Sequence, residues 1–521
     1  MTLILGINAF HADAAAALVR DGTILGAAEE ERFRRIKHWA GFPSQAIAWC
    51  LADAGVTLSD VDHIAINSQP GVHRWRKVAY TVARRPDPRF LIKRWRNKRE
   101  RAGLAEQLRS AFPEQSLRAE LHFIEHHRAH LASAFYASPF QEAAVVSVDG
   151  FGDFASVAWG HGNGSTLSLD GQIYFPHSLG AFYTAITQYL GFPHYGDEYK
   201  VMGLAPYGQP LHLEAMRQIV HLKEDGTFRL DLRYFRHATE NLPHQWSQGI
   251  PVVGEHWSSE LESLLGPARQ PDQPLDQRHK DIARSAQAMY EEAFFHLLKA
   301  LHRHHPSDHL CIAGGCGANS VANGKVTVAT PFRRVYVQAA AGDAGGALGS
   351  ALEVWHRLGH PRCRPMLSAY LGSGPAEGDI DVLLREPATA RAVEQAHCLI
   401  SRPEQSELCD QVATAISEGL VIGWFEGRME WGPRALGHRS ILGDPRRADM
   451  KDILNLKIKR RESFRPFAPS VLEEAVGDWF SLDGEVPFMM QVYPIREEQR
   501  TRIPAVTHVD GSGRLQTVNA A

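Results

Sequence analysis

The sequence predicts an α/β fold whose two halves open with the same unit of two strands. Residues 3–8 and 14–19 are apolar segments of strand length, and a polar Asp-Gly turn follows them. Residues 143–150 and 156–159 repeat this order and are followed by a glycine-rich turn. Apolar runs of this length bounded by turn residues are typical of strands. Two such units in one chain indicate an internal duplication.

Each half of a duplicated ribonuclease-H-like fold begins in this way, as in actin, sugar kinases and the heat-shock chaperone ATPases. The helices that such a fold needs are present as segments with apolar residues at intervals of three and four. They are residues 44–54, residues 104–112 and a long amphipathic segment at 282–302. A buried strand is predicted at 309–313, and a helix rich in small residues runs from Gly346 towards Trp355.

Residues 360–378 contain several prolines and glycines and are predicted to link two domains. Beyond them, residues 409–418 are predicted as a helix and residues 420–425 as a strand. A chain of 521 residues is too long for one ordinary core. We therefore expect a first domain of residues 1–365 and a separate α/β domain of residues 366–521.

Composition and charge are those of a soluble globular protein. Hydrophobic residues make up 44% of the chain and charged residues 22%, and the net charge is −3, so no overall attraction to nucleic acid or to a membrane is expected. No apolar run is long enough to span a bilayer, and the N-terminus does not read as a secretory signal. The six cysteines are scattered, as is usual for reduced thiols. We expect a cytoplasmic protein, and a homodimer is one assembly to consider.

One segment departs from this balance. Residues 74–99 carry many basic residues, interleaved aromatic residues and one acidic residue, Asp87. The pattern also occurs where proteins contact nucleic acid. Because the whole chain is not basic, we favour a solvated helical insertion whose aromatic residues pack on the body, and nucleic acid is not an expected partner.

Four side chains are candidates for a metal site. His126 and His130 are four residues apart, so a helix would present both imidazoles on one face. Asp149 ends a buried strand, and Asp343 lies in a second acidic turn. Two imidazole nitrogens and two carboxylates suit Fe(II), Zn(II) or Mn(II) and do not choose among them.

A glycine-rich turn is a candidate nucleotide site. Gly314 and Gly315 leave a predicted strand, where glycine lets backbone N–H groups approach a ligand. Asn319 follows and can hydrogen-bond a ribose or a base.

The C-terminal part holds a dense group of arginines on Gly-Pro turns, beside Glu430, in residues 426–446 and 457–470. Bidentate recognition of phosphate needs guanidinium groups held in this way. Interleaved aromatic residues such as Trp431 and Phe464 argue against a solvated basic loop, because they should bury the arginine stems. We predict a phosphate site here.

These motifs together resemble the O-carbamoyltransferase family, which includes the nodulation-factor, aminoglycoside, cephamycin and novobiocin carbamoylating enzymes. The resemblance covers essentially the full chain. The matching stretches are residues 6–13, 29–38, 126–130, 147–150, 198–208, 314–325, 427–472 and 503–518.

The resemblance implies two domains, an actin-like domain similar to the Kae family and an α/β domain similar to YrdC. In such enzymes carbamoyl phosphate and ATP, with Mg²⁺, give carbamoyladenylate in the second domain. The first domain then passes the carbamoyl group to a hydroxyl of a small-molecule acceptor, such as a natural product or a sugar.

The resemblance also implies roles for individual residues. His126, His130, Asp149 and Asp343 match the metal ligands, with iron as the first expectation. His11 matches a residue beside the transferring group and is our candidate general base or orienter, and Lys37 is a second catalytic candidate. Gly314, Gly315 and Asn319 fall where adenosine is held. The carbamoyl-phosphate clamp matches Lys459, Arg465 and Arg514, with Arg434 and Arg439 as supporters.

Family members continue beyond the strand that ends near Val518, whereas this chain stops at Ala521. We therefore expect the YrdC-like domain to be incomplete at its C-terminal end. Two alternatives stay open at this point. One is a transferase of the tRNA threonylcarbamoyl type, and the other is a non-catalytic binding or regulatory homologue.

Overall fold

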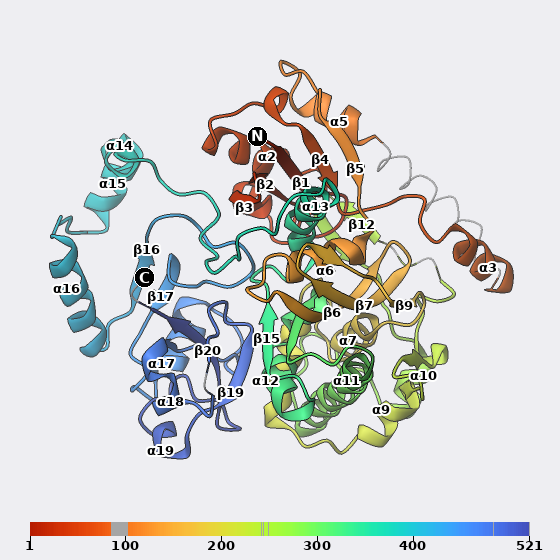
Figure 1. Cartoon of the computed structure of the whole chain (residues 1–521). Coiled ribbons are helices and arrows are strands. Elements are labelled where there is room, and N and C mark those ends of the chain that lie inside the picture. The colour runs from red at the N-terminus through yellow and green to blue at the C-terminus, as the bar shows by residue number, and fades with distance from the viewer. Residues whose placement is uncertain (85–102, 241, 243, 248, 483, 520–521) are drawn as a thin grey trace.

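Two β-sheets of the same topology organise the first part of the chain (Figure 1). The computed structural model describes residues 1–84, 103–240, 242, 244–247, 249–482 and 484–519. The first sheet has the strand order β3-β2-β1-β4-β5, in which β1 to β3 are antiparallel and β4 and β5 follow parallel to β1. Its strands are β1 (Leu3–Asn8), β2 (Ala15–Arg20), β3 (Thr23–Glu29), β4 (His63–Ile66) and β5 (Glu120–Phe123).

The second sheet repeats this arrangement in the order β9-β7-β6-β14-β15. Again the first three strands are antiparallel, and β14 and β15 follow parallel to β6. The repeated strand order confirms the duplicated ribonuclease-H-like fold. The strands are β6 (Glu142–Gly152), β7 (Ala155–Asn163), β9 (Gly171–Tyr174), β14 (His309–Ala313) and β15 (Arg334–Val337), with the short β8 (Thr166–Leu167) beside β7.

Two helices pack against each other between these sheets. They are α13 (Asp343–Arg357), which covers β1, β2 and β4, and α6 (His126–Phe135), which covers β6 and β14. Their contact is close, because a β-carbon on Gly349 would lie 1.9 Å from the carbonyl oxygen of Ala129. A β-carbon on Gly6 in β1 would similarly lie 2.0 Å from the carbonyl oxygen of Ala347. Only glycine fits at these two positions.

Helices on the outer faces complete the two halves. The predicted helices are found as α2 (Ser44–Asp53), α5 (Leu104–Ala111) and a long α11 (Gln277–His304), and α2 packs on β2 and β3. The remaining elements here are α1 (Glu31–Arg34), α3 (Arg74–Arg84), α7 (Leu179–Tyr189), α8 (Glu198–Leu204), α9 (Leu213–Ile219), β10 (Val220–Leu222), β11 (Phe228–Leu230), β12 (His244–Ser247), β13 (Ile250–Val253), α10 (Ser259–Leu265) and α12 (Ser320–Ala329).

The basic segment is seen in part. Within α3, Tyr80 packs on Phe154 and Phe175, as expected for an aromatic residue that anchors an insertion. Trp75, in contrast, is 85% exposed. Residues 85–102 lie outside the described residues. None of the described helices combines the length and the apolar character that a membrane-spanning segment needs.

The predicted linker is irregular, but it is docked. Residues 361–377 form no helix or strand, yet Cys363, Met366 and Ala369 are buried. The N–H of Met366 donates to the carbonyl oxygen of Ala137 (2.8 Å). The segment therefore packs on the N-terminal half, which its proline and glycine content did not reveal.

The last part of the chain forms a hairpin and a small sheet. Three helices without buried residues precede them and stand apart from the body in Figure 1: α14 (Asp379–Arg385), α15 (Pro387–Gln395) and α16 (Gln405–Ser417). The hairpin pairs β16 (Ile422–Phe425) with β17 (Arg439–Leu442), and the sheet has the order β18-β20-β19. The strands of this sheet are β18 (Ser470–Leu472), β19 (Gln491–Pro494) and β20 (Ser512–Val518). Three short helices accompany them: α17 (Met450–Asp452), α18 (Val476–Trp479) and α19 (Glu497–Arg500).

Candidate active site

Helix α6 places two histidines one turn apart and buries both. The helix begins at His126, and the side chain of its N-cap residue, Glu125, accepts a hydrogen bond from the N–H of Arg128 (2.7 Å). His126 and His130 are 1% and 0% exposed, and their Nε2 atoms lie 3.0 Å apart. Two imidazole nitrogens facing one point supply half of a metal-binding set.

Two carboxylates from other elements complete the group. Asp149 in β6 places Oδ2 3.0 Å from His126 Nε2 and 3.2 Å from His130 Nε2. Asp343, the first residue of α13, places Oδ1 3.6 and 3.5 Å from the same two nitrogens. One ligand atom of each residue lies within 4.8 Å of all the others. The structure thus brings together the four side chains that the sequence singled out, and we call them the four-ligand group.

Glycines make room for this group. A β-carbon on Gly152 would lie 2.0 Å from the His126 ring, and one on Gly315 would lie 2.8 Å from Asp149 Oδ1. That oxygen accepts hydrogen bonds from the N–H groups of Gly150 (2.8 Å) and Gly315 (3.0 Å). The other oxygen, Oδ2, is therefore the one directed at the histidines.

The electrostatics of the group favour a cation at its centre. Burial lowers the pKa of His130, but hydrogen bonds to Asp149 and Asp343 raise it to about 9. Burial raises the pKa of Asp149, but its hydrogen bonds to the two histidines hold the pKa well below the usual value. The pKa of Asp343 is raised by burial and by the neighbouring Asp149. Two imidazole nitrogens and two carboxylate oxygens around one buried point fit Fe(II), Zn(II) or Mn(II).

The loop after β1 lies beside the four-ligand group. The centre of the His11 ring is 5.4 Å from that of His126. Lys37 is exposed on a turn. Its neighbour His38 instead turns towards the loop and places Nδ1 2.8 Å from Asp13 Oδ1. Sequence reasoning missed this pair, although His38 adjoins Lys37 and Asp13 lies two residues after His11.

The pair is held in an unusual backbone conformation. Asp13 and His38 both have φ near +56°, which side chains other than glycine rarely adopt. A hydrogen bond from the N–H of Ala14 to the carbonyl oxygen of Trp39 (2.9 Å) ties the two loops together. The His38 ring is 5.3 Å from Tyr195. Burial and the carboxylates of Asp13, Asp343 and Asp149 raise the pKa of that tyrosine, so it lies close to both groups.

The predicted nucleotide turn contacts Asp149 through Gly315. Gly314 has φ +88°, and a β-carbon there would lie 2.2 Å from the carbonyl oxygen of Val148. Asn319 caps α12 and exchanges two hydrogen bonds of 3.1 Å with the amide of Gln287. Its side chain is thus engaged within the protein, and its contact with a nucleotide stays a prediction.

Five basic side chains gather in the C-terminal part, and we call them the basic cluster: Arg434, Lys459, Arg461, Arg465 and Arg514. Burial and the charges of three neighbouring arginines lower the pKa of Arg514 well below its usual value, and burial lowers the pKa of Arg434 to about 10. The Nε atoms of both are buried and have no hydrogen-bond partner among the described residues. Arg461 was not singled out from the sequence, although it follows Lys459 in a basic run. A site with this excess of positive charge suits phosphate.

Arg439 does not join the basic cluster. Its guanidinium donates to the carbonyl oxygens of Glu426 (2.5 Å) and Gly427 (3.0 Å) and lies 3.6 Å from the centre of the Phe425 ring. These contacts close the β16–β17 hairpin. Arg439 is thus engaged within the hairpin, and its support of a carbamoyl-phosphate clamp stays a prediction.

Helix α8 connects the basic cluster with the N-terminal half. Lys200 pairs with Glu462 (3.3 Å), and Glu462 also pairs with Arg465 (3.2 Å). The guanidinium of Arg465 lies 4.4 Å from the centre of the Tyr199 ring. At the start of the same helix, the half-buried Glu198 accepts a hydrogen bond from Thr184 (2.7 Å).

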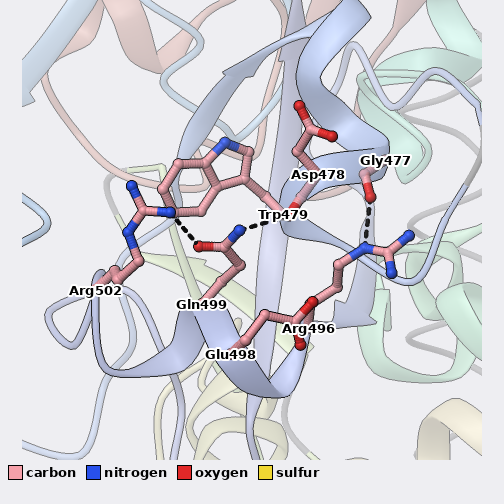
Figure 2. A pocket seen from close by; sticks show the side chains of 7 residues that line it. All are labelled: Gly477, Asp478, Trp479, Arg496, Glu498, Gln499 and Arg502. Atoms are coloured by element: carbon pink, nitrogen blue, oxygen red, sulfur yellow. Dashed lines mark hydrogen bonds between the residues drawn. The ribbon is translucent and has the colours of Figure 1, made fainter.

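A surface hollow of about 560 Å³ lies elsewhere, beside α18 and α19 (Figure 2). Two of its arginines are engaged within the protein: Arg496 donates to the carbonyl oxygen of Gly477 (2.5 Å), and Arg502 donates to Gln499 (2.7 Å). It contains no residue that the sequence singled out as a site residue.

Comparison with known proteins places the chain in a family. Residues 3–352 match the model of the carbamoyltransferase N-terminus, and residues 413–521 match that of the carbamoyltransferase C-terminus. Protein sll1178 of Synechocystis is 42% identical over all of this chain and 87% of its own length. Nodulation protein NolNO of Sinorhizobium fredii is 38% identical over 98% of this chain and 70% of its own length.

Solved structures resemble the chain more distantly. HypF of T. kodakarensis is 15% identical, with a TM-score of 0.35, over 69% of this chain and 48% of its own. The ROK hexokinase of Thermus thermophilus is 13% identical, with a TM-score of 0.33, over 69% of this chain and 99% of its own.

Proposed function

This chain belongs to the carbamoyltransferase family, and we propose that it uses ATP to move the carbamoyl group of carbamoyl phosphate onto a hydroxyl of a small molecule. The observation that carries the proposal is the convergence of the four-ligand group at one buried point. It lies beside the loop after β1, which carries His11, and that loop is paired through Asp13 with His38 on a second loop. Such a site can polarise an activated carbonyl and also accept a proton.

In the first step, carbamoyl phosphate, ATP and water give carbamoyladenylate, phosphate and pyrophosphate. The basic cluster is our proposed site for carbamoyl phosphate. An incoming phosphate would supply the negative charge that this cluster lacks, and guanidinium groups bind it in a bidentate manner. Mg²⁺ would accompany ATP.

In the second step, the acceptor hydroxyl attacks the carbamoyl carbon and AMP leaves. A divalent cation held by the four-ligand group would supply Lewis-acid chemistry. The Asp13 carboxylate fixes Nδ1 of His38 and leaves Nε2 to take the hydroxyl proton, while His11 orients the carbamoyl group. The turn at Gly314 and Gly315 would hold the adenylate beside Asp149.

The proposal is tested with carbamoyl phosphate, MgATP and Fe(II). We expect pyrophosphate release that requires carbamoyl phosphate. We also expect carbamoylated products by mass spectrometry when sugars and other hydroxyl compounds are added as acceptors. Absence of pyrophosphate release from the metal-loaded full chain would overturn the adenylation step. Pyrophosphate release without AMP formation under any of these conditions would overturn the transfer step.

A further inference from the structure

A second group of potential metal ligands lies at the edge of the first sheet. His63 begins β4, and Glu120 and His122 lie on β5, which is the last strand of that sheet. The strands are parallel, with His63 opposite Glu120 and Ala65 opposite His122. Residues two apart on a strand point to the same face, so Glu120 and His122 share a face and meet His63 there.

The distances among these three side chains are those of a shared ion. His63 Nδ1 lies 3.0 Å from His122 Nε2, and the Glu120 carboxylate lies 3.7 and 3.9 Å from these two nitrogens. Ligand atoms about 2.0–2.2 Å from one zinc ion are separated by roughly 3–4 Å. One atom from each residue lies within 4.8 Å of the others, as in the four-ligand group.

The setting also favours a ligand over chance proximity. The two imidazole side chains are only 16% and 20% exposed, whereas that of Glu120 is 68% exposed. The rings are therefore held by the sheet, and the carboxylate side is open for an ion to enter. Imidazole and carboxylate are the usual protein ligands of Zn(II) and its neighbours.

We propose that His63, Glu120 and His122 bind a divalent cation of the zinc type, separate from the four-ligand group, and that this ion pins the edge strand. His63 and His122 are 59 residues apart, so the ion would close a long insertion. The inference does not depend on the proposed carbamoyl transfer.

The position of β5 gives this ion a consequence for the active site. The strand ends at Phe123, and the N–H of Ile124 still donates to the carbonyl oxygen of Ile66 (2.9 Å). Glu125 then caps α6, whose first residue is the candidate ligand His126. Fixing β5 to β4 therefore fixes the start of the helix that carries two of the four ligands.

Metal content of the full chain, measured after dialysis against Zn(II), tests the proposal. We expect one ion fewer per chain in His63→Ala/His122→Ala than in the wild type, and also one fewer in His126→Ala/His130→Ala. Equal zinc content in the wild type and His63→Ala/His122→Ala would show that the two rings merely share a hydrogen bond, and would overturn the site.

A single substitution at the exposed member of the group tests the site with less risk of misfolding than the double histidine variant. Because Glu120 is exposed, Glu120→Ala should fold and weaken zinc binding at this site by about tenfold or more. Glu114→Ala removes an exposed carboxylate that is not part of the group and should leave binding unchanged. Zinc should also slow amide hydrogen exchange of residues 120–124 in the wild type but not in Glu120→Ala. Identical affinity and exchange in the two would contradict the proposal.

Discussion

The carbonyl oxygen of Ala129 lies 1.9 Å from the place where a β-carbon on Gly349 would have to be. This contact sets the separation of α6 and α13. His126 and His130 lie on the first of these helices and Asp343 begins the second. The four-ligand group therefore depends on this close helix contact, which lies within about two turns of Asp343 along α13, as well as on the ligands themselves.

Gly349→Ala should force the two helices apart. We expect a loss of about 1–3 kcal/mol in the free energy of unfolding, measured with urea, and weaker metal retention. Gly423→Ala is the matched control, because a β-carbon there would meet no atom within 4 Å. Full stability and full metal content in Gly349→Ala would contradict the close contact.

Removing the histidine ligands should separate the two half-reactions. His126→Ala/His130→Ala should lose the metal and reduce carbamoyl transfer about 100-fold or more. Pyrophosphate release should change little, because the basic cluster is untouched. His127→Gln is the control on the same helix. The His127 ring faces Ser147 Oγ (3.0 Å) and is kept neutral by burial, which lowers its pKa to about 4. If carbamoyl transfer survives the loss of the metal, the metal has a structural role only.

Arg514→Met should stabilise the protein and impair binding of carbamoyl phosphate. The charged guanidinium is disfavoured by burial and by neighbouring arginines, so its removal should raise the free energy of unfolding by about 1–2 kcal/mol. KM for carbamoyl phosphate should rise, and phosphate should raise Tm in the wild type more than in the variant. Equal phosphate-induced shifts in both proteins would argue against an anion site.

The Asp13–His38 pair predicts a pH dependence. Burial lowers the pKa of His38, but the hydrogen bond and charge of Asp13 raise it above 6.5 overall; Lys37 opposes this rise and Glu31 adds to it. Stability from protonated His38 is therefore complete below the unfolded pKa and is lost as pH rises through the folded pKa.

Transfer needs the neutral imidazole, so its rate should rise over the same interval. Asp13→Asn should move both transitions to lower pH. Urea unfolding and transfer rates from about pH 5 to 9 check this. Superimposable profiles for the wild type and Asp13→Asn would exclude His38 as the proton acceptor.

The sequence predicted best those features that depend on local spacing. The two strand pairs revealed the duplicated fold because each lies within a short segment. The four-residue interval between His126 and His130 placed both rings on one helix face for the same reason.

Individual side-chain partners and backbone conformations that no spacing pattern marks were not predicted. The amide partner of Asn319 is Gln287, 32 residues earlier on another helix. His38, and not Lys37, turns towards Asp13 because the backbone at His38 is left-handed. The residue types around His38 do not predict this conformation. The hydrogen bonds of Arg439 to carbonyl oxygens of its own hairpin were likewise not predicted.

Helix α8 contacts both the loop of the basic cluster and the surroundings of the glycine-rich turn. Lys200 and Tyr199 contact the loop of the basic cluster. The half-buried Glu198 contributes to raising the pKa of Cys316 in the glycine-rich turn. If carbamoyl phosphate binds the basic cluster as proposed, a shift of that loop on binding would act directly on the helix. The proposed phosphate site and the proposed nucleotide site would then be coupled through this one short helix.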